Sequence, residues 1–196
     1  MRPGRNPVIS GATPYPSVCR VGGDYYLVSA SSEYFPGVPI FHSRDLAQWR
    51  QVGNVLTRPE QLGLPADTPA SRGIHGTTLR HHDGRFHLIA TNTSTGGNFV
   101  VTAERAAGRW SDPVWIDLPG VAPDLAWDDD GDCWCATSDG HVARVDPDTG
   151  AVLERPWRIW RPGPTPRLHR ADGRWYLLHE DGDELVVARA RTPRGP

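Results

Sequence analysis

Residues 23–28, Gly23-Asp24-Tyr25-Tyr26-Leu27-Val28, join a Gly/Asp turn to an apolar run of aromatic and branched residues, the pattern of a strand entered from a tight turn. The same form recurs along the chain at intervals of roughly 40 to 60 residues. The recurrences are Asp83-Gly84-Arg85-Phe86-His87-Leu88, Asp130-Gly131-Asp132-Cys133-Trp134-Cys135 and Asp172-Gly173-Arg174-Trp175-Tyr176-Leu177. This spacing is typical of propeller blades. The sequence therefore predicts an all-β protein, a β-propeller.

The strands expected around these turns form about four blades within one domain, residues 1–196. The fourth blade is one strand short, and no fifth follows. An open sheet edge invites pairing with other chains. Either the ring closes with fewer blades, or a second copy or a partner chain covers the edge, or the chain is a shortened descendant of a longer protein. The segment 57–72 is rich in Pro, Gly and small polar residues and is expected to form a long excursion over one face. The expected strands are 18–21, 25–30, 39–43 and 49–53 in the first blade and 77–80, 86–91, 98–102 and 115–118 in the second. The third blade is expected to run from Leu125 through Trp134 and 141–145 to Trp157, and the fourth to contain 167–170, 175–179 and 185–190.

The composition agrees with this architecture. The 196 residues include 21 Gly, 19 Pro and 8 Trp with 38% hydrophobic residues, which suits short strands and tight turns better than helices. A formal net charge of -2 gives no reason to expect nucleic acid or an anionic membrane as partner. Residues 1–5 are followed by no apolar signal-peptide region, so the expected location is cytoplasmic.

Several residue clusters resemble metal sites but lack the ligand spacing. Cys133 and Cys135 are expected to pack in the core with Cys19, since two thiols without a second pair make a weak zinc site. The run 128–131 lacks the alternating ligands of a calcium loop and is expected to be a turn. His81 and His82 are neighbours on a strand and point apart. We therefore expect no metal and no other cofactor.

Longer motifs resemble glycoside hydrolase family 43, the β-xylosidases and α-arabinofuranosidases. They cover nearly the whole chain. The motifs are Asn6-Pro7-Val8-Ile9, Glu33-Tyr34-Phe35-Pro36-Gly37-Val38-Pro39-Ile40-Phe41-His42-Ser43-Arg44-Asp45-Leu46, Leu56-Thr57-Arg58-Pro59, Gly96-Gly97-Asn98-Phe99 and Trp110-Ser111-Asp112-Pro113. The resemblance implies a five-bladed propeller, here shortened to about four blades, with a sugar pocket at one end of its axis.

The resemblance also implies inverting hydrolysis by three carboxylates, with acid and base about 6.5 to 9.5 Å apart. Each carboxylate is replaced here. Tyr15 stands at the base, Ala122 at the aspartate that tunes the acid, and Pro164 at the acid itself, behind a shortened loop. A phenol with a pKa near 10 stays protonated at neutral pH and cannot act as the carboxylate does. General acid or base catalysis contributes about 10²- to 10⁴-fold per group, so the ancestral reaction is expected to be lost.

The candidate pocket residues are the remaining polar groups near these places. Ser32 and His75 stand where the resemblance implies Phe and Trp, and the histidine of a fifth blade is absent. Each candidate also has a purely structural interpretation, such as a filled hole at Tyr15, a hydrogen-bonded structural His75 or an exposed Arg167. The candidates are Tyr15, Ser32, Glu33, His75, Asp124, Arg167 and Glu180.

Three functions follow from this pattern. The first is a family 43-like propeller that binds a small molecule or carbohydrate without hydrolysing it. The second is an enzyme with new acid-base chemistry built on Tyr15, His75, Asp124 and Arg167. The third is a residual xylosidase or arabinofuranosidase that uses Glu33 or Glu180.

Overall fold

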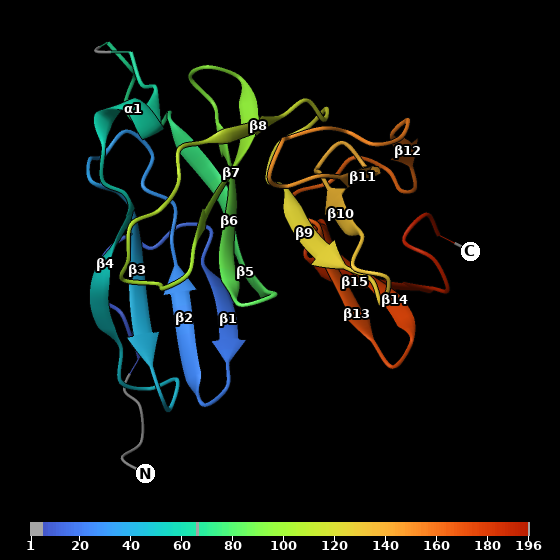
Figure 1. Cartoon of the computed structure of the whole chain (residues 1–196), viewed down its shortest axis with the longest axis horizontal. Helices are drawn as coiled ribbons and strands as arrows, with labels where there is room; N and C mark the ends of the chain where they lie inside the picture. Colours follow the sequence, from blue (N-terminus) through green and yellow to red (C-terminus); the bar gives the residue numbers. More distant parts are fainter. Residues whose placement is uncertain (1–5, 66, 196) are drawn as a thin grey trace.

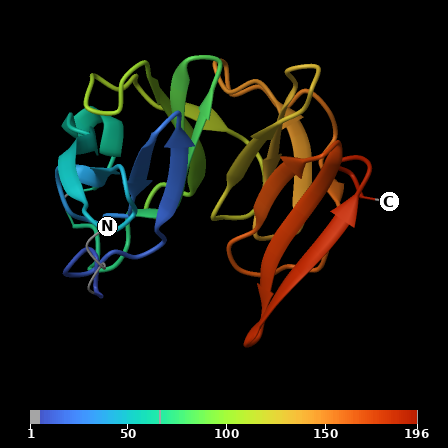
Figure 2. The same cartoon turned by 90° about the horizontal axis from the view of Figure 1, so that it is seen from below.

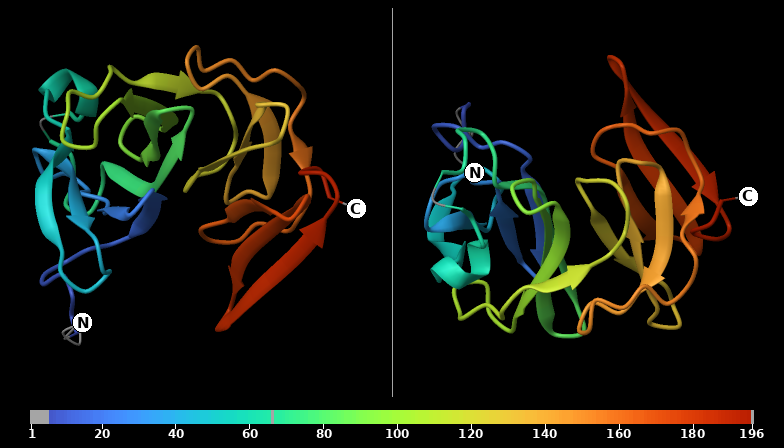
Figure 3. Two further views of the ribbon diagram at one scale, coloured as in Figure 1. Left: turned by 60° about the horizontal axis from the view of Figure 1, so that its bottom comes forward. Right: turned by 90° about the horizontal axis from the view of Figure 1, so that it is seen from above.

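The computed structural model describes residues 6–65 and 67–195, so the expectation for residues 1–5 lies outside the described part. Four separate antiparallel sheets follow one another along the chain, and within each the strands pair in sequence order. The sheets lie along an open arc, with the first sheet (blue) and the fourth (red) at its two ends (Figures 1 and 3). Figure 2 shows the same arrangement from below. The predicted all-β propeller of about four blades is confirmed.

Each blade begins at the inside of the arc and ends at its outside. The first three blades have four strands, and the fourth has three among the described residues, as predicted. The blades contain, in order, β1 (Ser17–Val21), β2 (Asp24–Val28), β3 (Gly37–Ser43) and β4 (Arg50–Leu56); β5 (Ile74–His82), β6 (Arg85–Asn92), β7 (Gly97–Ala103) and β8 (Val114–Ile116); β9 (Asp124–Trp127), β10 (Cys133–Ala136), β11 (His141–Val145) and β12 (Trp157–Arg158); β13 (Arg167–Ala171), β14 (Arg174–Asp181) and β15 (Glu184–Ala190).

The repeated Asp-Gly pairs form the tight turns that open the second strand of a blade. Asp83 and Asp172 have left-handed φ angles of 46° and 49°, a conformation that Asp tolerates better than most residues. They connect β5 to β6 and β13 to β14. The turn before β10 is built differently, because the Asp128 carboxylate accepts hydrogen bonds from the backbone N–H of Asp130 and Asp132 and from the Trp134 indole. The prediction that 128–131 is a turn is confirmed.

Hydrophobic cores lie between neighbouring blades. One joins the first and second blades through side chains such as Ile40 and Leu88, and a second joins the second and third through Val100 and Leu125. A third joins the third and fourth blades around Trp175. Cys133 and Cys135 are free and buried in the second core, and burial raises the pKa of both thiols, which confirms core packing.

The histidine pair also lies as the strand alternation predicts. His82 stacks on Trp127 with ring centroids 4.5 Å apart, while His81 contacts Phe86 at 4.8 Å. The two imidazoles therefore take part in different contacts. Among residues 6–65 and 67–195, no three His, Cys, Asp or Glu side chains are grouped as a metal site would need. The described part also has no helix of the length and apolarity that crossing a membrane takes.

Within the expected excursion 57–72, Pro59–Leu62 forms the short helix α1, which the sequence analysis does not predict. The buried Gln61 explains it. Its Oε1 accepts the backbone N–H of Thr57 and Arg58, and its Nε2 donates to the Ser111 carbonyl. The turn is thus stabilised by a residue 50 positions away, which local sequence patterns do not report.

Candidate functional site

One repeated backbone geometry occurs at or near the start of the innermost strand of each blade. Tyr15, Gly76, Ala122 and Thr165 have φ angles between 41° and 57°, and each is followed by Pro or Thr and then by a polar residue. Gly76 needs its missing side chain, because a Cβ there would lie 2.4 Å from the Cα of Ala122. Two of the three expected catalytic positions, Tyr15 and Ala122, occupy this repeated place, and Pro164 directly precedes the fourth.

The polar residue of each of the first three repeats joins its blade to the next. Ser17 Oγ accepts the backbone N–H of Leu79 at 3.0 Å, and Thr78 Oγ1 donates to the Pro123 carbonyl at 3.0 Å. Asp124 Oδ2 accepts the backbone N–H of Leu168 at 2.7 Å. These three contacts, from here on the inter-blade staples, hold the innermost strands side by side.

The first four predicted pocket residues lie around one segment, Ser71–Thr77. The Tyr15 carbonyl accepts a hydrogen bond from Thr77 Oγ1, and the Tyr15 and His75 rings are 5.7 Å apart. Ser32 pairs with Ile74 through two backbone hydrogen bonds, and the Glu33 carboxylate accepts the backbone N–H of Ser71 at 2.9 Å. The structure thus brings Tyr15, Ser32, Glu33 and His75 together; we call them the axial cluster.

The His75 imidazole has a defined proton position. Its Nε2 lies 2.9 Å from the Ser71 carbonyl, which can only accept, so Nε2 carries the hydrogen. In the neutral ring Nδ1 is then an acceptor, without a hydrogen-bond partner among the described residues. The 41%-exposed Tyr15 lies beside it. The pair can hold a polar ligand through an acceptor and a phenol.

Asp124 and Arg167 form a second group, between the third and fourth blades. Asp124 is completely buried and pairs with Arg80, whose Nη2 lies 2.6 Å from Oδ2, while Oδ1 has no partner. Arg167 donates to its own Pro166 carbonyl, and burial lowers the pKa of its guanidinium. Asp124 is therefore an inter-blade staple as well as a candidate ligand.

Glu180 lies apart from the axial cluster but on the same face of the fourth sheet as Arg167, and its charge acts to raise the pKa of that guanidinium against the larger effect of burial. Trp175 and Leu177 of β14 pack against the third blade, and strand alternation turns the exposed Glu180 to the opposite face, beside Leu185 of β15. The structure does not bring Glu33 and Glu180 into one hydrogen-bonded group.

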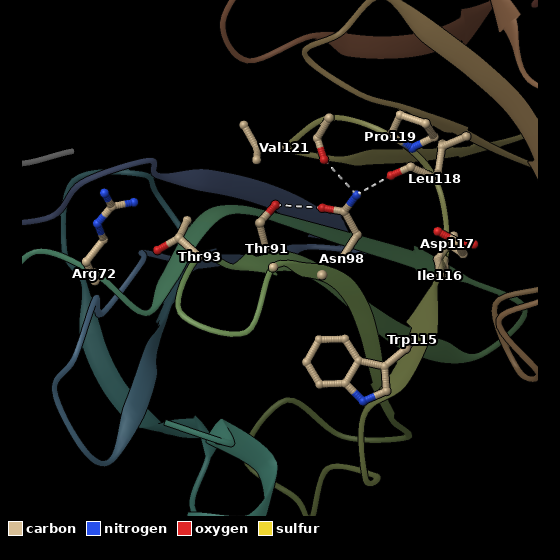
Figure 4. Close-up of a pocket in the computed structure, with 13 residues that line it drawn as sticks. Arg72, Thr91, Thr93, Asn98, Trp115, Ile116, Asp117, Leu118, Pro119 and Val121 are labelled. Carbon is tan, nitrogen blue, oxygen red and sulfur yellow. Dashed lines mark hydrogen bonds between the residues drawn. The ribbon is translucent and has the colours of Figure 1, made fainter. Parts of the chain in front are cut away.

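A cavity of about 570 Å³ opens at the end of the second blade, where β6 ends and β7 begins. Figure 4 shows Arg72 at one side, Trp115 and Asp117 at the other, and Thr91 and Asn98 on the floor. Sequence reasoning missed these residues. The available signal was Trp115 itself, a large aromatic residue in a three-residue strand whose neighbour Ile116 is buried.

Comparison with known proteins identifies the family. The family model "Glycosyl hydrolases family 43" matches residues 4–196. The chain belongs to glycosyl hydrolase family 43.

The relatives are xylosidases and arabinofuranosidases. A xylosidase/arabinosidase of Butyrivibrio fibrisolvens is 42% identical across 95% of this chain and 41% of its own length. A non-reducing end α-L-arabinofuranosidase of Bacteroides ovatus is 36% identical across 98% of this chain and 39% of its own length. The crystal structure of a xylan β-1,4-xylosidase from Bacillus halodurans is 33% identical, with a TM-score of 0.90 over 99% of this chain and 42% of that chain.

This chain and its family 43 relatives differ in length. The chain spans about two fifths of their length. The Butyrivibrio alignment is 219 positions long, more than the 196 residues of the chain, so that relative has segments inside the matched region with no counterpart here. Shortened connections of this kind agree with the short loop expected before Pro164.

Proposed function

We propose that this family 43 propeller binds a carbohydrate containing pentose units at the axial cluster and does not hydrolyse it. One observation carries the proposal: the expected catalytic positions hold a phenol, a methyl group and a pyrrolidine ring, at Tyr15, Ala122 and Pro164. The pentose comes from the relatives, which are named xylosidases and arabinofuranosidases.

The carboxylates near the site support a binding function. Glycoside hydrolysis needs two carboxyl groups facing one glycosidic bond, separated by about 5 to 10 Å. Glu33 is engaged by the backbone of Ser71, and the buried Asp124 by Arg80 and Leu168. Both accept hydrogen bonds that hold the fold, so each has a structural role that accounts for its presence.

A direct assay tests the proposal. Purified chain is incubated at high concentration with nitrophenyl β-xyloside and nitrophenyl α-arabinofuranoside from pH 4 to 9, and calorimetry measures binding of xylose, arabinose and xylobiose. We expect binding without nitrophenol release above the buffer rate. Sustained release that disappears in Glu33→Gln or Glu180→Gln would show that the catalytic carboxylates have moved, and would refute the proposal.

The contact between Tyr15 and His75 favours a second function, an enzyme with new acid-base chemistry. An imidazole acceptor beside a phenol can exchange protons with a substrate other than a glycoside. His75→Ala would then abolish turnover of such a substrate while the unfolding midpoint stays near the wild-type value. His81→Ala, on the same strand but in contact with Phe86, is the matched control.

A further inference from the structure

The cavity at the end of the second blade has the properties of a built site, in addition to the axial cluster. Its floor is held by hydrogen bonds: Thr91 Oγ1 donates to Asn98 Oδ1, and Asn98 Nδ2 donates to the Leu118 and Gly120 carbonyls, each at 3.0 Å. The wall 117–121 is fixed from behind as well, because the backbone N–H of Val121 donates a hydrogen bond to Ser138 Oγ at 3.0 Å. A pocket held this way loses little entropy when a ligand enters.

Trp115 presents an exposed aromatic face at this cavity. Its side chain is 46% exposed, although a tryptophan on a strand is usually more deeply covered. The ring lies over Gly97, where a Cβ would be 2.8 Å from the indole, and contacts Phe99 at a centroid distance of 5.4 Å. The missing side chain at Gly97 thus sets the position of the ring.

Two charges of opposite sign lie at the rim. The Arg72 guanidinium and the Asp117 carboxylate are both exposed, and neither side chain has a hydrogen-bond or ion-pair partner among residues 6–65 and 67–195. An anionic ligand would be attracted by Arg72 and repelled by Asp117. A cationic ligand would be attracted by Asp117 and repelled by Arg72. A neutral ligand with hydroxyl groups satisfies both, since a hydroxyl donates to a carboxylate and accepts from a guanidinium.

We propose that this cavity, the Trp115 pocket, binds one ring of a neutral oligosaccharide. The apolar C–H face of a sugar lies on the indole, and its hydroxyls reach Arg72 and Asp117. The volume of about 570 Å³ is within the range of small-molecule sites and holds one ring with some water. The inference extends the proposed function, because it adds a second sugar contact to that of the axial cluster.

The test follows the Trp115 indole N–H by nuclear magnetic resonance in protein labelled with ¹⁵N-tryptophan, during titration with xylotriose. The resonance is assigned by its absence in Trp115→Phe. We expect a saturable shift, and an affinity about tenfold lower in Trp115→Ala. Arg72→Gln, which removes an exposed side chain and leaves the fold intact, should weaken binding roughly threefold.

The matched control is Trp157→Ala, since Trp157 is a 51%-exposed tryptophan on β12 outside the pocket, and its affinity should equal that of the wild type. His75→Ala should leave the Trp115 shift in place. Xylotriose binding with an unmoved Trp115 resonance and an unchanged affinity in Trp115→Ala would overturn the Trp115 pocket and leave the proposed function standing. Absence of any binding at millimolar xylotriose would overturn the Trp115 pocket, and the proposed function as well if xylose, arabinose and xylobiose also fail to bind.

Discussion

At the scale of single residues, His87 shows how burial in this fold controls charge. It lies on β6, is 3% exposed, and has a buried Nδ1 without a partner. Burial lowers the pKa of its imidazole to about 4 from an ordinary value of 6.5, and the positive charge of Arg85 contributes in the same direction. The folded protein therefore keeps His87 neutral under mildly acidic conditions in which the unfolded chain protonates it.

This difference predicts how stability depends on pH. Above pH 6.5 both states hold His87 neutral, and its contribution is constant; as pH falls from 6.5 to 4, the unfolded state gains a proton first and stability decreases. The total loss is about 3 kcal/mol. Urea unfolding at pH 7.5, 5.5 and 4.5 measures it, and His87→Gln should flatten the slope. His169, whose pKa burial also lowers, contributes a slope of the same sign that remains in the variant. An unchanged slope in His87→Gln would contradict the assignment.

At the scale of elements, the inter-blade staples explain how separate sheets become one body. No strand of one blade pairs with a strand of another in the described sheets. Apart from the backbone pair of Ser32 and Ile74, the staples join the innermost strands through side chains. The Asp124 staple is the one that carries charge, because a single carboxylate oxygen receives both the Leu168 N–H and the Arg80 guanidinium.

Asp124→Ala should therefore destabilise the fold strongly. It leaves the mostly buried Arg80 without its partner and removes the acceptor for β13, a loss of about 3 to 5 kcal/mol. The control is Asp129→Ala, since Asp129 also pairs with an arginine, Arg170, but at the surface. Chemical denaturation should detect a large shift of the midpoint in the first variant and almost none in the second. Equal effects would mean that burial does not decide the strength of these pairs.

At the scale of the whole molecule, the two ends of the arc differ from its interior. The second and third blades each pack both faces of their sheet against a neighbouring blade. The fourth blade packs only one face, and on its other face Leu185 is 66% exposed and Val187 is 56% exposed. Val18 of the first blade is 45% exposed at the opposite end. The hydrophobic effect thus stabilises one face of the fourth blade only.

The two faces can be compared with one residue type. Leu177→Ala, in the core between the third and fourth blades, should cost about 2 to 4 kcal/mol of unfolding free energy, and Leu185→Ala less than about 0.5. Urea denaturation of the 196-residue chain, at several protein concentrations, gives both values. A large cost for Leu185→Ala that grows with concentration would show that a second copy covers this face in solution.

The local pattern of the chain determined the blades, and the three-dimensional packing decided the site. Asp-Gly turns followed by apolar strands are contacts between near neighbours, so the strands and most of their order could be predicted, as could the turn at Asp128 and the family. Helix α1 could not be predicted, because Gln61 is held by Ser111.

The polar residues at the propeller end were found by resemblance, but their partners depend on where the blades meet. Asp124 accepts hydrogen bonds from Leu168 and Arg80, and Glu33 accepts one from Ser71. Trp115 became a candidate ligand only when its exposure and Gly97 beneath it were visible. Exposure and orientation arise from contacts distant in sequence, which the linear pattern does not contain.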